Sequence, residues 1–243
     1  MNSGLIRFAI ILLTCAVSFP QFAAAELSGS FRFTTQYVSR GYSKSGGHPS
    51  VQGNLDYEHD AGFFAGTWIS SIDFNDDAYA DRANVEIAPY LGWHVPLSDD
   101  WQADGYLSRY FYDGKLFGQY SDYNELNVLV NFRDLASARI GWSENLYNRG
   151  HAALDYELTA RYPFTDTLEV SAGLGFSDTK QALHYNYLYW NSGISWFFKY
   201  GSIDLRYVQA SQSQSDHSAA IQPQHFEPKV LNGDIVFSMS IGF

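Results

Sequence analysis

The chain alternates between apolar and polar residues with a period of two through most of its length. The last ten residues, DIVFSMSIGF, show the pattern plainly: Ile235, Phe237, Met239, Ile241 and Phe243 are apolar, with mostly small residues between them. A period of two puts successive side chains on opposite faces of an extended strand. Each alternating segment therefore predicts a β-strand with one apolar face and one small or polar face.

About twelve such segments of roughly 9–14 residues follow one another, the length that a tilted strand needs to cross a bilayer. Short connections fall at residues 59–62, 97–100, 133–135, 164–167 and 199–201, and mostly longer ones at 41–50, 75–83, 113–122, 178–184 and 212–231, with 147–151 as a short exception. Bacterial outer-membrane barrels have short periplasmic turns and longer extracellular loops. The sequence therefore predicts an all-β fold: a single antiparallel transmembrane β-barrel of about 12 strands, with both termini periplasmic.

A soluble, aromatic-rich β-sandwich is the alternative, because aromatic residues make up 17% of the chain and could fill a core. In a sandwich the apolar faces turn inward and the terminal strand needs protection at its edge. In a membrane barrel these faces turn to lipid, closure removes the edge, and aromatic residues form girdles at both interfaces. Only the barrel accounts for the alternation of short and long connections.

Turning the apolar faces outward assigns particular residues to the lipid side. They include Leu27, Phe31, Phe33 and Tyr37 in the first segment and Phe64, Trp68, Ile72 and Phe74 in the third.

Two residues do not fit the alternating pattern. Pro89 lacks the N–H that a strand ladder uses, so it predicts a bulged or shortened strand. Arg109 falls on an outward face, where a charge costs least near the interface, so we expect it close to a loop.

The opposite faces would line the lumen, and most of their charged residues are acidic. The candidate pore-lining residues are Arg32, Arg40, Asp56, Glu58, Asp73, Glu86, Asp104, Glu125, Arg139, Asp155, Glu157, Arg161, Glu169, Asp204, Arg206 and Asp234. An excess of acids favours cations if water fills the lumen. The alternative is that these charges pair across the interior and plug it, since a barrel of about twelve strands lies between filled and open sizes.

The first 25 residues have the composition of a secretory signal peptide. One basic residue, Arg7, precedes an apolar stretch, and small residues at positions 23–25 suit cleavage before Glu26. We therefore expect a signal peptide at residues 1–25, export through the Sec pathway, and a barrel at residues 26–243 in the outer membrane of a Gram-negative cell. Cleavage would remove Cys15, the single cysteine, so no disulfide is expected.

Other functional classes find little support. The formal net charge of −11 argues against a nucleic-acid partner. The seven histidines show no tight ligand spacing such as HExxH, so neither a metal site nor a cofactor is predicted. Asp216, His217 and Ser218 have the residue types of a hydrolase triad but are adjacent in a polar segment at 209–229, which we expect to be a surface loop. We therefore expect no enzyme, and a barrel-embedded hydrolase is the least favoured alternative.

Three stretches resemble the TorF-type porin family of outer-membrane proteins: YVSRGYS at residues 37–43, PSVQGNLDYEHDAGFFAGTWISSIDF at 49–74, and DYNELNV at 122–128. The family's acidic pattern in the fourth strand appears here as Glu86-Ile87-Ala88-Pro89, which is a departure. The resemblance implies an outer-membrane channel for passive diffusion of small hydrophilic solutes. The alternative function is a non-conducting structural or surface-recognition barrel.

The C-terminal strand also resembles the signal that the barrel-assembly machinery binds on its substrates. Phe237, Met239, Ile241 and Phe243 would form this signal, with an aromatic residue last. The expected partners are therefore outer-membrane lipid, the assembly machinery during biogenesis, and small solutes. The sequence does not predict an oligomeric state.

Overall fold

The structure, a computed structural model, describes residues 25–212 and 230–243. The predicted signal peptide lies outside the described residues except for Ala25, as does most of the predicted surface loop at 209–229. Within the described ranges, none of the helices has the length and hydropathy of a membrane-spanning segment.

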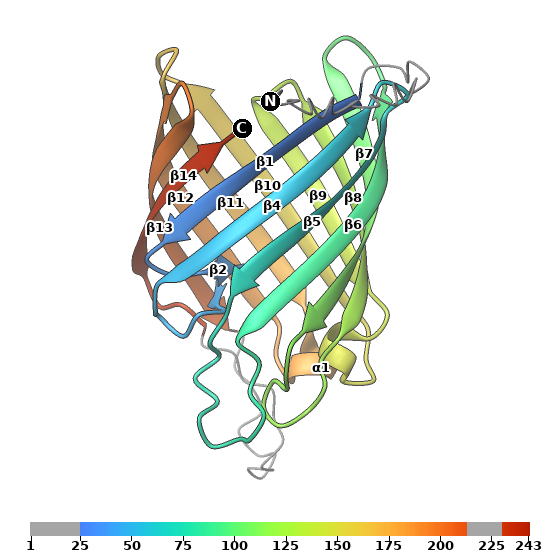
Figure 1. Cartoon of the computed structure of the whole chain (residues 1–243), viewed down its shortest axis with the longest axis vertical. Helices are drawn as coiled ribbons and strands as arrows, with labels where there is room; N and C mark the ends of the chain where they lie inside the picture. Colours follow the sequence, from blue (N-terminus) through green and yellow to red (C-terminus); the bar gives the residue numbers. More distant parts are fainter. Residues whose placement is uncertain (1–24, 213–229) are drawn as a thin grey trace, which may run out of the picture.

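Twelve antiparallel strands form one closed barrel (Figure 1). In chain order they are β1 (Ala25–Thr34), β4 (Ser50–His59), β5 (Phe63–Ser71), β6 (Val85–Pro96), β7 (Trp101–Tyr112), β8 (Tyr123–Phe132), β9 (Ala136–Ser143), β10 (Ala153–Pro163), β11 (Leu168–Asp178), β12 (Tyr187–Phe198), β13 (Gly201–Gln212) and β14 (Asp234–Gly242). Strand β1 closes the ring by pairing with β14, where Phe31 lies opposite Ile241. Closure leaves no unpaired edge, and it confirms the predicted antiparallel barrel and its strand number.

The connections alternate in length between the two ends of the barrel. Those after β4, β6, β8, β10 and β12 are short and lie at the same end as Phe243, which we call the turn end (Figure 1). The longer connections gather at the opposite end, the loop end, where two of them contain the short helices η1 (Leu146–Asn148) and α1 (Lys180–Leu183). The connection after β9 covers residues 144–152, so it is longer than the sequence predicted.

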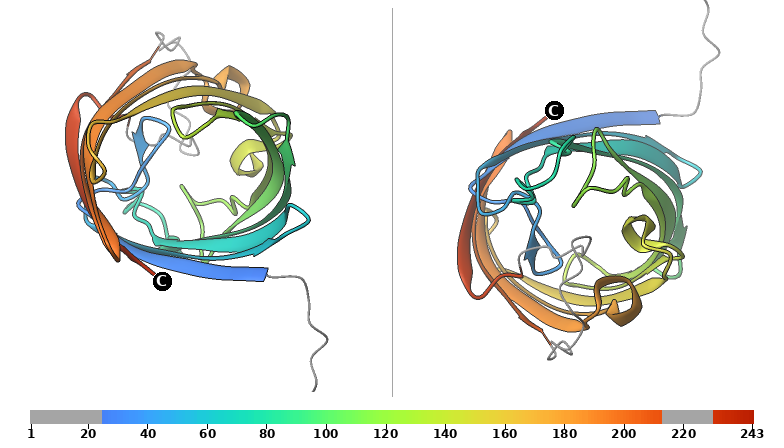
Figure 2. Two further views of the ribbon diagram at one scale, coloured as in Figure 1. Left: turned by 90° about the horizontal axis from the view of Figure 1, so that it is seen from above. Right: turned by 90° about the horizontal axis from the view of Figure 1, so that it is seen from below.

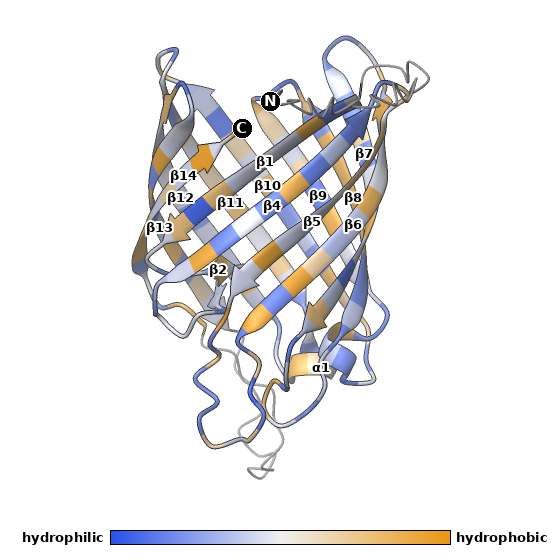
Figure 3. Cartoon of the chain, viewed as in Figure 1, coloured by the Kyte–Doolittle hydropathy of each residue, from blue (hydrophilic) through white to orange (hydrophobic). Residues whose placement is uncertain are grey.

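Successive residues of a strand face opposite sides of the barrel wall. On β14, Ile235 is 70% exposed, whereas the next residue, Val236, is only 6% exposed. Apolar and polar residues alternate along the strands (Figure 3), and the apolar ones are mostly those exposed on the outside of the barrel. Because the most exposed strand residues include Leu, Ile, Val, Phe and Trp, the wall has the apolar outer belt of a lipid-facing barrel.

Strand β5 departs from the predicted faces. Trp68 pairs with Ala88 on β6, and Ala88 lies on the same face as Glu86, which is fully buried inside the barrel. Phe64 and Trp68 therefore face the lumen, and the prediction that they face lipid is wrong. The opposite face of β5 holds Ile69, which is exposed, so hydropathy does not distinguish the two faces of this strand.

Three further residues of the predicted lipid face also lie inside. Ile72 and Phe74 follow β5 and are buried, and the Tyr37 hydroxyl donates a hydrogen bond to Glu86. They belong to or pack against an aromatic cap at the loop end, which we define by Tyr42, Ile72, Phe74, Tyr112, Leu116, Phe117, Tyr123, Leu146, Tyr147, Leu183, Tyr185, Tyr187 and Tyr189. Loops that fold over the barrel mouth shield these side chains from water, so burial replaces lipid as their apolar environment.

The two strained positions have different outcomes. The pairing of β6 with β7 skips Ala88 and Pro89 and resumes in the same register at Tyr90. Strand β6 is therefore neither bulged nor shortened, and the prediction for Pro89 is wrong, because an interrupted ladder suffices to accommodate a missing N–H. Arg109 lies near the loop end of β7, as predicted, with its guanidinium 4.0 Å from the Asp122 carboxylate.

The connection between β1 and β4 folds into the barrel instead of extending outward. It forms a small hairpin of β2 (Val38–Ser39) and β3 (Tyr42–Ser43), and Figure 2 shows this segment, in blue, inside the ring of strands. Backbone hydrogen bonds fix it at two points: the Asp73 N–H donates to the Lys44 carbonyl at 2.8 Å, and the Leu231 N–H donates to the Gly41 carbonyl at 3.0 Å. The hairpin is therefore held in a fixed position inside the lumen.

Candidate functional site

The turn of the inward hairpin is encoded by Arg40 and Gly41. Both residues have positive φ, +48° and +79°, as the two central residues of a two-residue hairpin with a type I′ turn require. At Gly41 a Cβ atom would lie 2.5 Å from the Tyr189 Cβ and 2.8 Å from the Ala210 Cβ. Only glycine fits this close approach, and the turn delivers the Arg40 side chain into the lumen.

Arg40 binds two carboxylates on the opposite wall. Its Nη2 lies 2.5 Å from Glu125 Oε1, and its Nη1 lies 2.7 Å from both Glu125 Oε2 and Asp155 Oδ2. Burial alone would lower the pKa of Arg40, but attraction by Asp155 and Glu125 outweighs it and raises the pKa well above its usual value. The guanidinium therefore stays charged, and the bidentate geometry fixes its plane.

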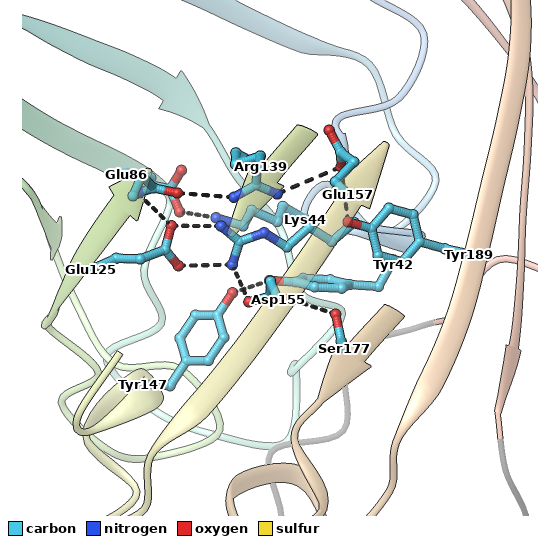
Figure 4. Close-up of polar contacts among 12 residues, drawn as sticks. Tyr42, Lys44, Glu86, Glu125, Arg139, Tyr147, Asp155, Glu157, Ser177 and Tyr189 are labelled. Atoms are coloured by element: carbon cyan, nitrogen blue, oxygen red, sulfur yellow. Dashed lines mark hydrogen bonds and ion pairs between the residues drawn. The ribbon is translucent and has the colours of Figure 1, made fainter. Parts of the chain in front are cut away.

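Both carboxylates have further partners. Glu125 accepts a hydrogen bond from the Asn127 amide at 3.0 Å, and Asp155 accepts one from the Ser177 hydroxyl (Figure 4). Each partner comes from the inward face of β8 or β11, so the strands supply a polar lining at the depth where the hairpin enters. Such additional hydrogen bonds offset part of the desolvation cost of a buried ion pair.

Lys44 forms a second ion pair beside the first. Its Nζ lies 2.6 Å from Glu86 Oε2, and Glu86 also accepts hydrogen bonds from the hydroxyls of Tyr37 at 2.9 Å and Tyr112 at 2.8 Å. The ammonium lies 5.1 Å from the centre of the Tyr110 ring, a cation–π distance. The Glu86 carboxylate therefore has an ion-pair partner and two hydrogen-bond donors, although the residue has no exposed surface.

We call Arg40, Lys44, Glu86, Glu125 and Asp155 the constriction cluster. The two cations stand on the hairpin and the three carboxylates stand on β6, β8 and β10. The charges therefore face one another across the lumen, and the cluster carries one net negative charge.

Further ion pairs lie around the cluster. Arg139 lies 3.5 Å from Glu157, which also accepts a hydrogen bond from the Tyr189 hydroxyl at 2.8 Å (Figure 4). On another part of the wall, Arg206 lies 3.0 Å from Asp204. Most of the basic side chains of the lumen are therefore held by carboxylates.

The aromatic cap closes over the hairpin on the loop side. The hydroxyls of Tyr42, on the hairpin, and Tyr147, in the connection after β9, hydrogen-bond to each other (Figure 4). Burial raises the pKa of both tyrosines well above the usual value, so both remain neutral hydroxyls. This contact ties the hairpin to the loops of the cap.

The structure places most of the predicted lumen residues on inward-facing strand positions. These are Arg32, Asp56, Glu58, Glu86, Asp104, Glu125, Arg139, Asp155, Glu157, Arg161, Glu169, Asp204, Arg206 and Asp234. Arg40 reaches the lumen from the hairpin, and Asp73 lies in the connection after β5, where it accepts a hydrogen bond from the Asn75 N–H. Their role in lining a water path stays a prediction.

Lys44 is the functional candidate that the sequence did not reveal. It lies in a segment expected to be an outward loop, where no periodicity indicates which side chains face inward. The dipeptide Arg40-Gly41 is the one local signal, because it suits a tight turn. Among the described residues, no group of three His, Cys, Asp or Glu side chains could hold a metal ion.

The fold is similar to those of solved porins. The structure of the KdgM porin aligns with a TM-score of 0.52 at 10% identity, covering 89% of this chain and 98% of that one. A second KdgM structure, in complex with disordered oligogalacturonate, gives a TM-score of 0.53 at the same identity and coverage. The NanC porin aligns with a TM-score of 0.50 at 9% identity, covering 90% and 99%. At such identities the likeness shows the fold alone.

The sequence matches none of the curated proteins. None of the comparisons confirms the resemblance to TorF-type porins, which stays a prediction. A family model does match residues 21–236, which is most of the chain. The chain belongs to the Gcw_chp family, described as a bacterial protein of unknown function.

Proposed function

We propose that the protein is an outer-membrane channel for the passive diffusion of small hydrophilic solutes, with a weak preference for cations. The observation that carries this proposal is the constriction cluster, in which Arg40 and Lys44 face Glu86, Glu125 and Asp155 inside a closed barrel. A barrel that served only as a scaffold could fill its lumen with apolar side chains, which would avoid the cost of burying charges.

The fold supports the same proposal. KdgM and NanC are named as porins, and one KdgM structure contains oligogalacturonate. The likeness to them extends over almost the whole barrel, although it does not identify a solute. The stretch that resembles TorF-type porins at residues 37–43 includes the hairpin turn that carries Arg40.

The charges of the lumen favour cations. The inward positions and the hairpin hold the bases Arg32, Arg40, Lys44, Arg139, Arg161 and Arg206, and the acids Asp56, Glu58, Glu86, Asp104, Glu125, Asp155, Glu157, Glu169, Asp204 and Asp234. Lys44 reduces the predicted excess of acids but does not remove it. A lumen with net negative charge concentrates cations and repels anions.

The location follows from the apolar outer belt together with the predicted signal peptide. In this proposal the barrel is exported through the Sec pathway, and the barrel-assembly machinery binds β14 before the barrel enters outer-membrane lipid. Phe237, Met239, Ile241 and Phe243 are exposed on the outer face of this strand, where an assembly factor could reach them. The turn end would then face the periplasm.

A non-conducting barrel is the second candidate, and the aromatic cap favours it. Tyr147, Leu116 and other apolar side chains fill part of the loop end, and the lumen charges beneath them are mostly paired. In that case the ion pairs would serve stability, and the loops would form a recognition surface. No catalytic role is proposed.

Planar-bilayer recording of the purified protein tests the choice. Well-folded wild-type protein should give conductance steps and, in a salt gradient, a reversal potential of the sign expected for cation preference. Replacing both Glu125 and Glu157 by glutamine should lower this preference, because it removes two lumen carboxylates near basic partners. Asp166→Asn is the matched control, since Asp166 is an exposed acid in the turn after β10 and does not line the lumen. Absence of conductance steps from protein that shows the heat-modifiable mobility of a folded barrel would favour the scaffold.

A further inference from the structure

A cavity lies in the lumen on the side of the wall formed by β1, β13 and β14. It has a volume of about 140 Å³, and its lining includes Arg32, Gln36, Trp68 and Arg206. Val38, Val208 and Val236 give it an apolar part, and the remaining lining residues are Thr34, Tyr37, Gln52, Asp204 and Ser238. We call it the β1 cavity. Its lining is amphipathic, with hydrogen-bond donors on one part and valines on another.

Two buried donors of this lining have no protein partner. The Gln36 Nε2 and the Trp68 Nε1 are both buried, and neither has a hydrogen-bond acceptor among the described residues. Gln36 as a whole is only 8% exposed. A buried N–H without an acceptor costs free energy, and native structures seldom leave such groups unpaired. The two donors therefore indicate a place for an acceptor that is not part of the chain.

Arg32 adds a charge to the same lining. Its Nε donates a hydrogen bond to the Ser240 hydroxyl at 3.0 Å, and within the described part of the chain it forms no ion pair. Arg206, by contrast, binds Asp204, Asn191 and Ser171. Since Arg206 and Asp204 neutralise each other, the β1 cavity carries the net positive charge of Arg32 in a lumen that is otherwise acidic.

We propose that the β1 cavity binds the carboxylate group of a small organic anion. A carboxylate is planar and offers two acceptor oxygens, which suits a guanidinium and two N–H donors, and the valines would contact a short aliphatic body. A neighbouring cavity of about 360 Å³ shares Tyr37 and Trp68 with it and is otherwise lined by Phe64, Tyr90, Tyr106, Tyr110, Ala88 and Ser108. No charged side chain lines this second space, so it would accept the apolar part of a larger carboxylate.

This site adds a solute class, small carboxylates, to the proposed channel function. A role in transport rests on the channel proposal, whereas carboxylate binding does not. Cations would be favoured by the lumen as a whole, and carboxylates would be held at one basic position on the wall. Binding and conductance can therefore be measured separately.

Ligand-observed NMR by saturation transfer tests the site on the whole mature barrel in detergent micelles. The probes are propionate, propionamide and propylammonium, which share one size and differ in head-group charge. Propionate should bind more tightly than propionamide by about tenfold, because hydrogen bonds to a charged group are stronger than neutral ones. Propylammonium should not compete with propionate. Equal binding of propionate and propionamide would overturn the proposal.

Three variants locate the binding. Arg32→Gln should remove most of the preference for propionate over propionamide, and Gln36→Met should weaken propionate binding by a smaller factor. Arg161→Gln is the matched control, because Arg161 also faces inward but lines a different space at the turn end. Unchanged propionate binding in folded Arg32→Gln protein would refute the assignment. Conductance without propionate binding would refute the carboxylate site and support the channel. Propionate binding without conductance would support the site and refute the channel.

Discussion

Two arginine–carboxylate pairs of similar length occupy opposite ends of the barrel. Arg40 and Glu125 lie 2.5 Å apart with side chains that are 13% and 1% exposed, and Arg133 and Asp100 lie 2.7 Å apart with side chains that are 57% and 45% exposed. The first pair joins the inward hairpin to the wall, and the second links two turns at the turn end. The two distances are similar, but the first pair is buried and the second is exposed to water.

The difference lies in what happens when a partner is lost. At the turn end, water solvates whichever charge remains, so an exposed pair contributes little to stability. In the constriction cluster the remaining carboxylates would be left buried without a counter-charge, which is costly. The loop end should therefore respond strongly to single substitutions, and the turn end should tolerate them.

Arg40→Met tests the largest expected effect. The substitution leaves Glu125 and Asp155 without their shared counter-ion, so the free energy of unfolding should fall by about 3–5 kcal/mol. Urea unfolding of the barrel in micelles, followed by tryptophan fluorescence, measures this change. Arg161→Met, at the turn end, should change it little. Equal stability of the two variants would show that the constriction cluster is open to water.

Gly41→Ala should have the next largest effect. The new Cβ would meet the Tyr189 Cβ at 2.5 Å, and the φ of +79° is unfavourable for alanine. Steric overlap and strain together should cost about 2 kcal/mol and displace the hairpin. Gly150→Ala is the matched control, because Gly150 has a φ of +80° but no atom within 4 Å of an added Cβ. Gly150→Ala should introduce backbone strain without steric overlap and so lower the free energy of unfolding less. An equal loss in Gly41→Ala and Gly150→Ala would argue against close packing of the hairpin.

Tyr147→Phe sharpens the comparison within the loop end. It removes the hydroxyl that bonds to Tyr42, so the free energy of unfolding should fall by about 1 kcal/mol. The same urea titration measures it. Tyr120→Phe should have no effect, since Tyr120 is among the exposed residues. If Tyr147→Phe also leaves stability unchanged, the hydroxyl pair does not hold the cap.

Arg133→Met should have the smallest effect. The hydrogen bond from Arg133 lowers the pKa of Asp100, so any stabilisation is present above the ordinary aspartate pKa and is lost as the pH falls through the lowered value. At neutral pH the variant should be only slightly less stable than the wild type, because the pair is exposed to water, and in an NMR titration the pKa of Asp100 should rise towards its ordinary value. A marked loss of stability at neutral pH would contradict the contrast between the two ends.

The period-two alternation and the lengths of the connections determined the barrel. Each strand has one face towards lipid and one towards the lumen, so alternate residues along its sequence are apolar and polar. The inward positions of Glu125, Asp155 and Glu157 could be predicted for this reason. So could the outward position of Phe243 on the terminal strand.

Tertiary structure alone decided how the loops and the lumen are filled. Lys44 lies in a segment without periodicity, and Phe64 and Trp68 lie on a strand with apolar residues on both faces, so local pattern could not place them. Whether an apolar face meets lipid or the interior depends on which distant segment covers it, and here the hairpin and the aromatic cap provide that cover. The pairing of Arg40 with Glu125 and Asp155 likewise joins segments far apart in the chain, because barrel closure and the inward turn at Gly41 bring them to one depth.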